Sequence, residues 1–117
     1  MKRKRTYKLF VDDMREIPCG WIGSRTVSEA IAILHALPIR EISLDHDILY
    51  NKSNGDTYQA LSLETFRGVL YYIMTMKNNT RPKIRIHTSN AGAALVLCQM
   101  FKLNFEKTYR HYDLGGF

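Results

Sequence analysis

Apolar and polar positions alternate along several short segments of the chain, and this pattern predicts β-strands. Segments 6–11 (TYKLFV), 41–45 (EISLD) and 83–87 (KIRIH) contain β-branched or aromatic residues and lead directly into polar clusters. We expect two weaker strands at 21–25 and 105–112. The link from the first strand to 21–25 is shorter than the crossover of about a dozen residues that parallel strands usually need. The strand at 21–25 is therefore displaced, antiparallel or irregular.

Three further segments repeat their apolar positions at helical spacing. The first helix begins with Thr26 and Glu29 at the T-x-x-E spacing of a capping box and ends before Pro38. The expected helices span 26–37, 60–77 and 91–102, with an exposed loop at 46–59. The expected buried faces are Val27, Ala30, Ile31, Leu34 and Leu37 in the first helix and Leu61, Phe66, Leu70, Ile73 and Met74 in the second. Strands separated by helices predict an α/β fold with a mostly parallel sheet.

The size and composition of the chain suit one soluble domain. It has 117 residues and a net charge of +6, so we expect a single domain over 1–117 with a basic tail at 1–5. The sequence contains no run of about 18 apolar residues, so we expect no transmembrane helix. The basic start is not followed by the apolar segment of a secretory signal. We expect a cytoplasmic protein with Cys19 and Cys98 as buried, reduced thiols. No aromatic stacking pattern accompanies the basic residues, which argues against sequence-specific DNA binding.

Polar clusters follow three of the predicted strands at the point where each strand ends. They are Asp12-Asp13, Asp45-His46-Asp47 and His87-Thr88-Ser89-Asn90. The carboxyl ends of parallel strands lie at one edge of a sheet, where open α/β folds bind ligands. Each cluster alone is as typical of a turn, a helix cap or a structural histidine as it is of a functional site. Their joint occurrence at three strand ends favours a functional site.

The side chains of these clusters suit a cation and a phosphate. Neighbouring carboxylates repel one another unless a cation offsets them, and oxygen ligands suit Mg²⁺, Mn²⁺ or Ca²⁺. The imidazoles also permit Zn²⁺ or an acid/base step. Ser89 and Asn90, before the next helix, offer hydrogen-bond donors to a phosphate. Arg15 either neutralises the acidic pair, grips a phosphate, or pairs at the surface with Glu16 or Glu41.

The order of these motifs resembles a known family. LFVDDMREIPCGW, EISLDHD and KIRIHTSN are similar to the motifs of the cyclic-phosphate-processing receiver-like family, and the resemblance extends over about residues 7–95. It implies a flavodoxin-like, three-layer α/β sandwich related to response-regulator receivers, with the first helix shortened or missing. It also implies a phosphate-containing nucleotide as ligand, and a small basic protein of this kind would suit a phage- or defence-related setting.

The resemblance implies that the residues of the three polar clusters, together with Arg15, form the site. For an enzyme, the candidate catalytic residues are Asp45, His46 and His87, the candidate substrate-binding residues are Arg15, Thr88, Ser89 and Asn90, and the candidate ligands of Mg²⁺ or Mn²⁺ are Asp12, Asp13, Asp45 and Asp47. The sequence departs from the family pattern where Gln59 replaces an aspartate and Ala91 replaces a proline. Lys102 and Lys107 are the candidates for the lysine that receivers carry on their fifth strand.

Three functions are compatible with these residues. The first is a metal-dependent phosphoesterase that acts on a cyclic-phosphate-containing nucleotide or RNA end. The second is a non-catalytic protein that sequesters a cyclic nucleotide signal. The third, disfavoured by the additional His46-Asp47, is a receiver phosphorylated on Asp45. Apolar residues on the helices suit a homo-oligomer interface as well as a core.

Overall fold

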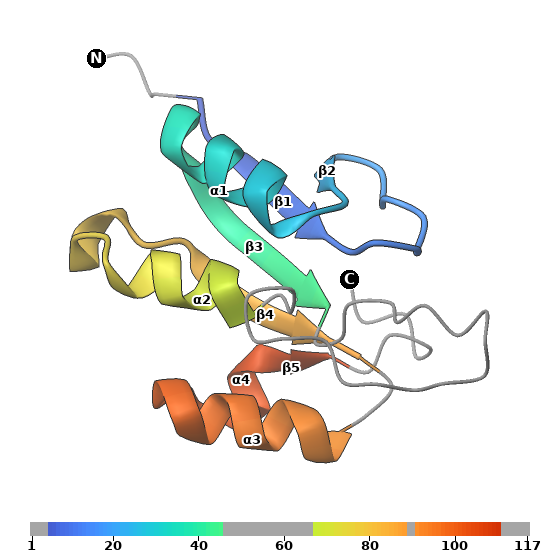
Figure 1. The fold of residues 1–117 in the computed structure, drawn as a ribbon, viewed down its shortest axis with the longest axis vertical. Helices are drawn as coiled ribbons and strands as arrows, with labels where there is room; N and C mark the ends of the chain where they lie inside the picture. The colour runs from blue at the N-terminus through green and yellow to red at the C-terminus, as the bar shows by residue number, and fades with distance from the viewer. Residues whose placement is uncertain (1–4, 46–66, 89–90, 111–117) are drawn as a thin grey trace.

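The computed structural model describes residues 5–45, 67–88 and 91–110, which form a five-stranded sheet with helices packed against it (Figure 1). The strands lie in the order β2-β1-β3-β4-β5, and each neighbouring pair is parallel. The strands are β1 (Tyr7–Val11), β2 (Ile22–Ser24), β3 (Ile39–Asp45), β4 (Lys83–His87) and β5 (Tyr109–Arg110). The helices are α1 (Val27–Ala36), α2 (Arg67–Met74), α3 (Ala91–Phe101), α4 (Phe105–Thr108) and the 3₁₀ turn η2 (Asn78–Thr80). The predicted α/β fold with a parallel sheet is confirmed.

The two faces of the sheet differ because side chains alternate along each strand. One face is apolar and forms a single buried cluster with the inner sides of α1, α2 and α3. The cluster includes Leu9, Val11, Ile42, Leu44 and Ile86 from the strands, and Ala30, Leu34, Val69, Leu70, Ile73, Ala94, Leu97 and Cys98 from the helices. The alternate positions carry Phe10, Ser43 and the ion pair between Glu41 and Arg85 on the opposite face. Asp45 and His87 come two residues after Ser43 and Arg85, so they also lie on this face, which the three helices do not cover.

The strand predicted at 21–25 is confirmed as β2, but it pairs with β1 in parallel, contrary to the expectation from its short link. Residues 12–21 form turns and no helix, as expected for a fold whose first helix is missing. The Trp21 N–H donates to the carbonyl of Pro18 at 3.2 Å, and Gly20 has a φ of +88°, which favours glycine. About ten extended residues, at ~3.3 Å each, are long enough to return along the ~17 Å of a five-residue strand without a helix.

The strand predicted at 105–112 is largely wrong. The chain first forms the helical turn α4, and the strand β5 contains only Tyr109 and Arg110 within the described residues. Asn104 caps the turn, because its side chain accepts a hydrogen bond from the backbone N–H of Lys107 at 3.0 Å. This local capping interaction overrides the β-propensity of the aromatic residues that follow.

Three smaller expectations are corrected. Leu37 is 36% exposed, because α1 ends at Ala36 and Leu37 takes up an extended backbone. The helix expected to reach residue 77 ends at Met74, and the Arg81 guanidinium donates to the carbonyls of Met74 and Met76. Cys98 is buried as expected, but Cys19 is exposed because it lies on the surface link 12–21.

Part of the prediction falls outside the described residues. The loop at 46–59 and the start of the second helix, with Leu61 and Phe66, stay predictions. The buried face of the described part of that helix contains Leu70 and Ile73, as the sequence indicated.

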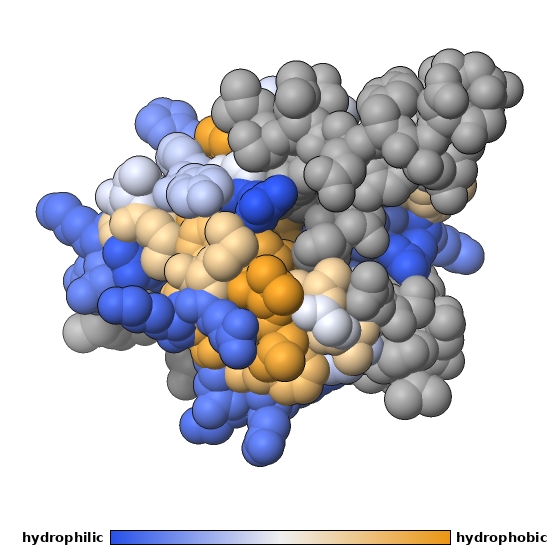
Figure 2. Space-filling view, turned by 60° about the horizontal axis from the view of Figure 1, so that its bottom comes forward, coloured by the Kyte–Doolittle hydropathy of each residue, from blue (hydrophilic) through white to orange (hydrophobic). Residues whose placement is uncertain are grey.

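The surface of α2 and α3 exposes several apolar side chains. Tyr71, Leu95, Val96 and Met100 are each more than 40% exposed, and Tyr71 packs against Phe101 with their ring centroids 5.0 Å apart. Figure 2 brings the α3 end of the molecule forward and shows a hydrophobic patch among polar residues. These side chains are suitable for the homo-oligomer interface considered above, which stays a prediction. No helix in the described ranges has the length and apolar character required to cross a membrane.

The end of α3 gives a testable prediction about stability. Lys102 has a φ of +57°, and the Leu103 N–H donates to the Cys98 carbonyl at 2.8 Å, which is the bond of a Schellman motif. A non-glycine residue in this left-handed conformation costs the folded state roughly 1–2 kcal/mol. Glycine avoids this cost, but it also makes the unfolded chain more flexible, which cancels part of the gain in stability. Lys102→Gly should raise the free energy of unfolding by about 1 kcal/mol or less in urea denaturation. The matched variant Lys102→Ala keeps the strain and should give no gain; an equal gain in both variants would contradict the prediction.

Candidate functional site

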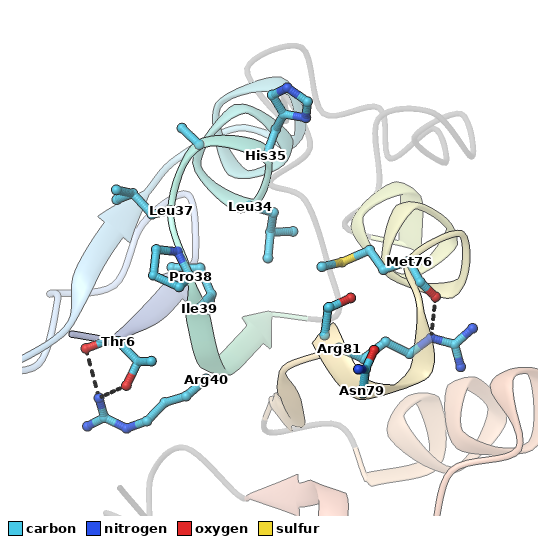
Figure 3. Close-up of a pocket in the computed structure, with 12 residues that line it drawn as sticks. Thr6, Leu34, His35, Leu37, Pro38, Ile39, Arg40, Met76, Asn79 and Arg81 are labelled. Carbon is cyan, nitrogen blue, oxygen red and sulfur yellow. Dashed lines mark hydrogen bonds between the residues drawn. The ribbon is translucent and has the colours of Figure 1, made fainter. Parts of the chain in front are cut away.

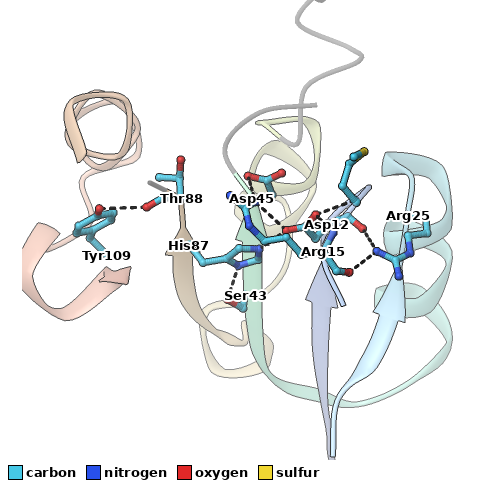
Figure 4. A network of polar contacts seen from close by, with 9 residues as sticks. Asp12, Arg15, Arg25, Ser43, Asp45, His87, Thr88 and Tyr109 are labelled. Atoms are coloured by element: carbon cyan, nitrogen blue, oxygen red, sulfur yellow. Dashed lines mark hydrogen bonds and ion pairs between the residues drawn. The ribbon is translucent and has the colours of Figure 1, made fainter. Parts of the chain in front are cut away.

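The ends of three adjacent strands bring Asp12, Asp45 and His87 together (Figure 4). Asp12 follows β1, Asp45 ends β3 and His87 ends β4, and these strands are neighbours in the sheet. The three residues are 0%, 6% and 0% exposed, and each offers one ligand atom within 4.8 Å of the others. The structure therefore places one residue from each of the three predicted clusters in a single buried group.

The carboxylate of Asp12 accepts four hydrogen bonds. Its Oδ1 accepts from the backbone N–H groups of Met14 at 2.9 Å and Arg15 at 2.8 Å. Its Oδ2 accepts from the Arg15 guanidinium at 3.1 Å and from His87 Nε2 at 2.8 Å. Burial alone raises the pKa of Asp12, but the bonds from His87, the two backbone groups and Arg15 outweigh burial and hold that pKa well below its usual range. Asp12 is consequently ionised, with all its acceptor positions occupied.

The imidazole of His87 is buried and held by hydrogen bonds at both ring nitrogens. Burial lowers the pKa of His87 and the nearby Arg15 charge lowers it further, against the opposing effect of Asp12. A carboxylate only accepts, so we assign the single ring proton to Nε2, which donates to Asp12. Nδ1 then accepts from the Ser43 hydroxyl at 2.7 Å. The ring stacks on Phe10 with centroids 4.3 Å apart, which fixes its plane.

Arg15 bridges the two buried carboxylates. Its guanidinium lies 3.1 Å from Asp12 Oδ2 and 3.4 Å from Asp45 Oδ1, and its side chain is 26% exposed. Of the alternatives left open by the sequence, the geometry shows the neutralising one. Glu41 forms its ion pair with Arg85 on the next strand.

Several residues of this network escaped sequence reasoning. Ser43 had a signal, because a serine two positions before Asp45 on a buried strand lies on the same face as the site. The Arg25 guanidinium donates to the backbone carbonyls of Asp12 at 3.0 Å and Arg15 at 2.6 Å, which holds the start of the link in place. These carbonyls belong to residues distant in sequence from Arg25, so the sequence carried no signal for this contact.

The remaining predicted residues are placed less centrally or are not described. Asp13 is partly buried beside Asp12, and Thr88 is buried after β4. The Thr88 carbonyl accepts from the Tyr109 hydroxyl at 3.0 Å, which ties β4 to β5. His46, Asp47, Ser89 and Asn90 lie outside the described residues, and their roles stay predictions.

Neither candidate lysine lies on the fifth strand. Lys102 follows α3 and Lys107 belongs to α4. The residue of β5 that aligns with His87 is Arg110. The strand thus carries an arginine at its carboxyl end.

A parallel sheet with acidic and imidazole side chains at the ends of its central strands defines a receiver-like α/β domain. A family model described as the cyclic-phosphate processing receiver domain matches residues 7–102, which include all three strand-end clusters. The chain belongs to this family, as its motifs indicated. No curated protein and no solved structure gives a significant match to the chain.

The donor set of the site is compatible with a divalent cation. Buried carboxylate oxygens are the ligands that Mg²⁺ and Mn²⁺ prefer, and Asp12 and Asp45 supply them on adjacent strands. His87 fits less well as a ligand, because Nε2 donates to Asp12 and Nδ1 contacts Ser43. The residues that would hold a cation are therefore the two aspartates, with His87 fixing the orientation of Asp12.

The buried histidine predicts a pH dependence of stability. Because the pKa of folded His87 lies below the ordinary 6.5, the unfolded chain binds a proton that the folded chain does not. The free energy of unfolding should therefore decrease as the pH falls below about 6.5, by up to ~1.4 kcal/mol per pH unit. Urea denaturation between pH 7.5 and 5.5, in EDTA, measures this slope.

The control for this experiment is the exposed His35 on α1. His87→Asn should lose the slope attributed to the buried ring, even if the variant is less stable at every pH. His35→Asn should retain it. Identical slopes in the two variants would show that another group causes the pH dependence.

Proposed function

We propose that this domain opens the cyclic phosphate of a nucleotide or RNA end with the help of Mg²⁺ or Mn²⁺. Family membership links the chain to cyclic-phosphate processing. The observation that carries the finer proposal is the pair of buried aspartates, Asp12 and Asp45, which share the Arg15 guanidinium between them. Arg15 supplies one positive charge to these two carboxylates, whereas a divalent cation would supply two.

The reaction proposed is hydrolysis of a cyclic phosphodiester. A water oxygen attacks the phosphorus, one of the two ester P–O bonds breaks, and the released oxygen takes up the proton that the water loses. A cation held by Asp12 and Asp45 would lower the pKa of a bound water and offset charge on the phosphate. Arg15 would bind the phosphate oxygens, as would the predicted Ser89 and Asn90.

His87 acts in this proposal through Asp12. Its ring is 0% exposed and stacks on Phe10, and its two nitrogens contact Asp12 and Ser43. Such a ring orients its neighbour and keeps it ionised, whereas proton transfer to a substrate requires direct reach. The proton carrier we propose is His46, the other histidine predicted at the strand ends.

The alternative of sequestration without cleavage has one observation in its favour. The ionisable groups Asp12 and His87 are both held by hydrogen bonds in a fixed arrangement. A fixed site of this kind is suitable for binding a phosphate and leaves the proton transfers of hydrolysis to other residues.

The experiment that separates these functions uses a panel of cyclic mono- and dinucleotides with and without Mg²⁺ or Mn²⁺, followed for both binding and product. We expect turnover that requires the cation. It should fall about 10- to 100-fold in Asp45→Asn, because this change removes a proposed ligand. Glu41→Gln is the matched control, since it removes a carboxylate of the same strand that pairs with Arg85. It should keep the turnover.

Other outcomes would point elsewhere. Tight binding with intact recovered nucleotide in both variants would favour sequestration over hydrolysis. The absence of both binding and turnover across the panel would contradict both functions. Covalent labelling of Asp45 by a small phosphodonor would instead support a phosphoacceptor receiver.

A further inference from the structure

The hydrogen bonds of Asp12 leave room for only one cation. An ionised carboxylate has about four acceptor positions. Three of those on Asp12 are taken by the backbone N–H groups of Met14 and Arg15 and by His87 Nε2. The fourth is taken by the Arg15 guanidinium. A metal ion can reach Asp12 only in place of that guanidinium, unless the turn or the histidine is displaced.

The same conflict exists at Asp45. The guanidinium nitrogen that contacts Asp12 lies 3.4 Å from Asp45 Oδ1, so it lies between the two residues that would hold the metal. Two positive charges about 4 Å apart repel strongly where water is largely excluded. The guanidinium and a divalent cation therefore do not occupy this position together.

The rest of Arg15 is fixed, and its side chain is the part that can move. The Arg15 N–H donates to Asp12 Oδ1 at 2.8 Å, and its carbonyl accepts from Arg25 at 2.6 Å. The side chain is 26% exposed, whereas that of Asp12 is 0% exposed. Rotation of the side chain toward solvent would release the guanidinium without disturbing the turn that holds Asp12.

We infer that Arg15 and a divalent cation compete for the same oxygens of Asp12 and Asp45, so that cation binding releases the Arg15 guanidinium toward a phosphate. This inference rests on the proposed function, since it concerns the same cation and the same substrate phosphate. The bound divalent cation would bring two positive charges to the two carboxylates, whereas the Arg15 guanidinium brings one. Arg15 then becomes available for bidentate binding of phosphate oxygens.

The competition is tested by titrating Mn²⁺ alone into the full chain by calorimetry, with no nucleotide present. Arg15→Gln should bind Mn²⁺ more tightly than the wild type, by a factor between about 5 and 150, which is the range of typical coupling between two ligands. The midpoint of thermal unfolding should also rise more on addition of Mn²⁺ in Arg15→Gln than in the wild type, so a less stable variant still gives a readout. At saturating Mg²⁺, Arg15→Gln should bind inorganic phosphate more weakly than the wild type.

The matched control is Arg40→Ala, which removes one positive charge at the opposite ends of the strands. Arg40 donates to the carbonyl and hydroxyl of Thr6 beside a separate pocket of about 610 Å³ (Figure 3). Its removal should leave the Mn²⁺ affinity unchanged. An equal gain in Arg40→Ala and Arg15→Gln would attribute the effect to net charge and overturn the competition.

The failure of the competition and that of the proposed function can be told apart. Equal Mn²⁺ affinity in wild type and Arg15→Gln, together with cation-dependent turnover of a cyclic nucleotide, overturns the competition and leaves the proposed function intact. A gain in Mn²⁺ affinity in Arg15→Gln, with neither binding nor turnover across the nucleotide panel, overturns the proposed function and leaves the competition intact.

Discussion

The four hydrogen bonds accepted by the buried Asp12 carboxylate are the interaction on which the site depends. They join the turn after β1 to His87 at the end of β4, with β3 between them in the sheet. An ionised carboxylate inside a protein is tolerated only when its desolvation is offset by such bonds. Here the offset is large enough to hold the Asp12 pKa well below its usual range, although burial acts in the opposite direction. Asp12 thus connects the turn after β1 to the end of β4, and it is also a candidate ligand of a metal ion.

The missing first helix has a direct consequence for the site. Arg15 lies three residues beyond Asp12, and the turns that follow β1 bring it back onto the Asp12 carboxylate. The same link brings Trp21 against Phe10, with ring centroids 6.0 Å apart, on the face of the sheet that the three longer helices do not cover. Phe10 in turn stacks on His87. The link therefore supplies both the positive charge of Arg15 and, through Trp21, part of the aromatic packing around His87.

In the proposed function, the chemistry of the site depends on which positive group faces the two aspartates. With Arg15 between them, the carboxylates are partly neutralised and the guanidinium is engaged. With a divalent cation, the same carboxylates would be fully compensated and the guanidinium would be available to a substrate. The proposed exchange would connect the two chemical roles that the sequence left open for Arg15, neutralisation and phosphate binding, because the two roles would belong to different states of one side chain.

The sequence by itself determined the elements and the edge at which the site lies. Period-two alternation and the capping residue Thr26 placed β1, β3, β4 and α1 correctly, since these signals are local. It failed at residues 105–108, where the cap at Asn104 prevailed over aromatic β-propensity, and at the direction of β2. Only the tertiary structure decided that Asp12 accepts four hydrogen bonds, that burial lowers the pKa of His87 and that Arg15 contacts both aspartates. Those properties depend on distances between atoms up to 75 residues apart in sequence, which no local pattern encodes.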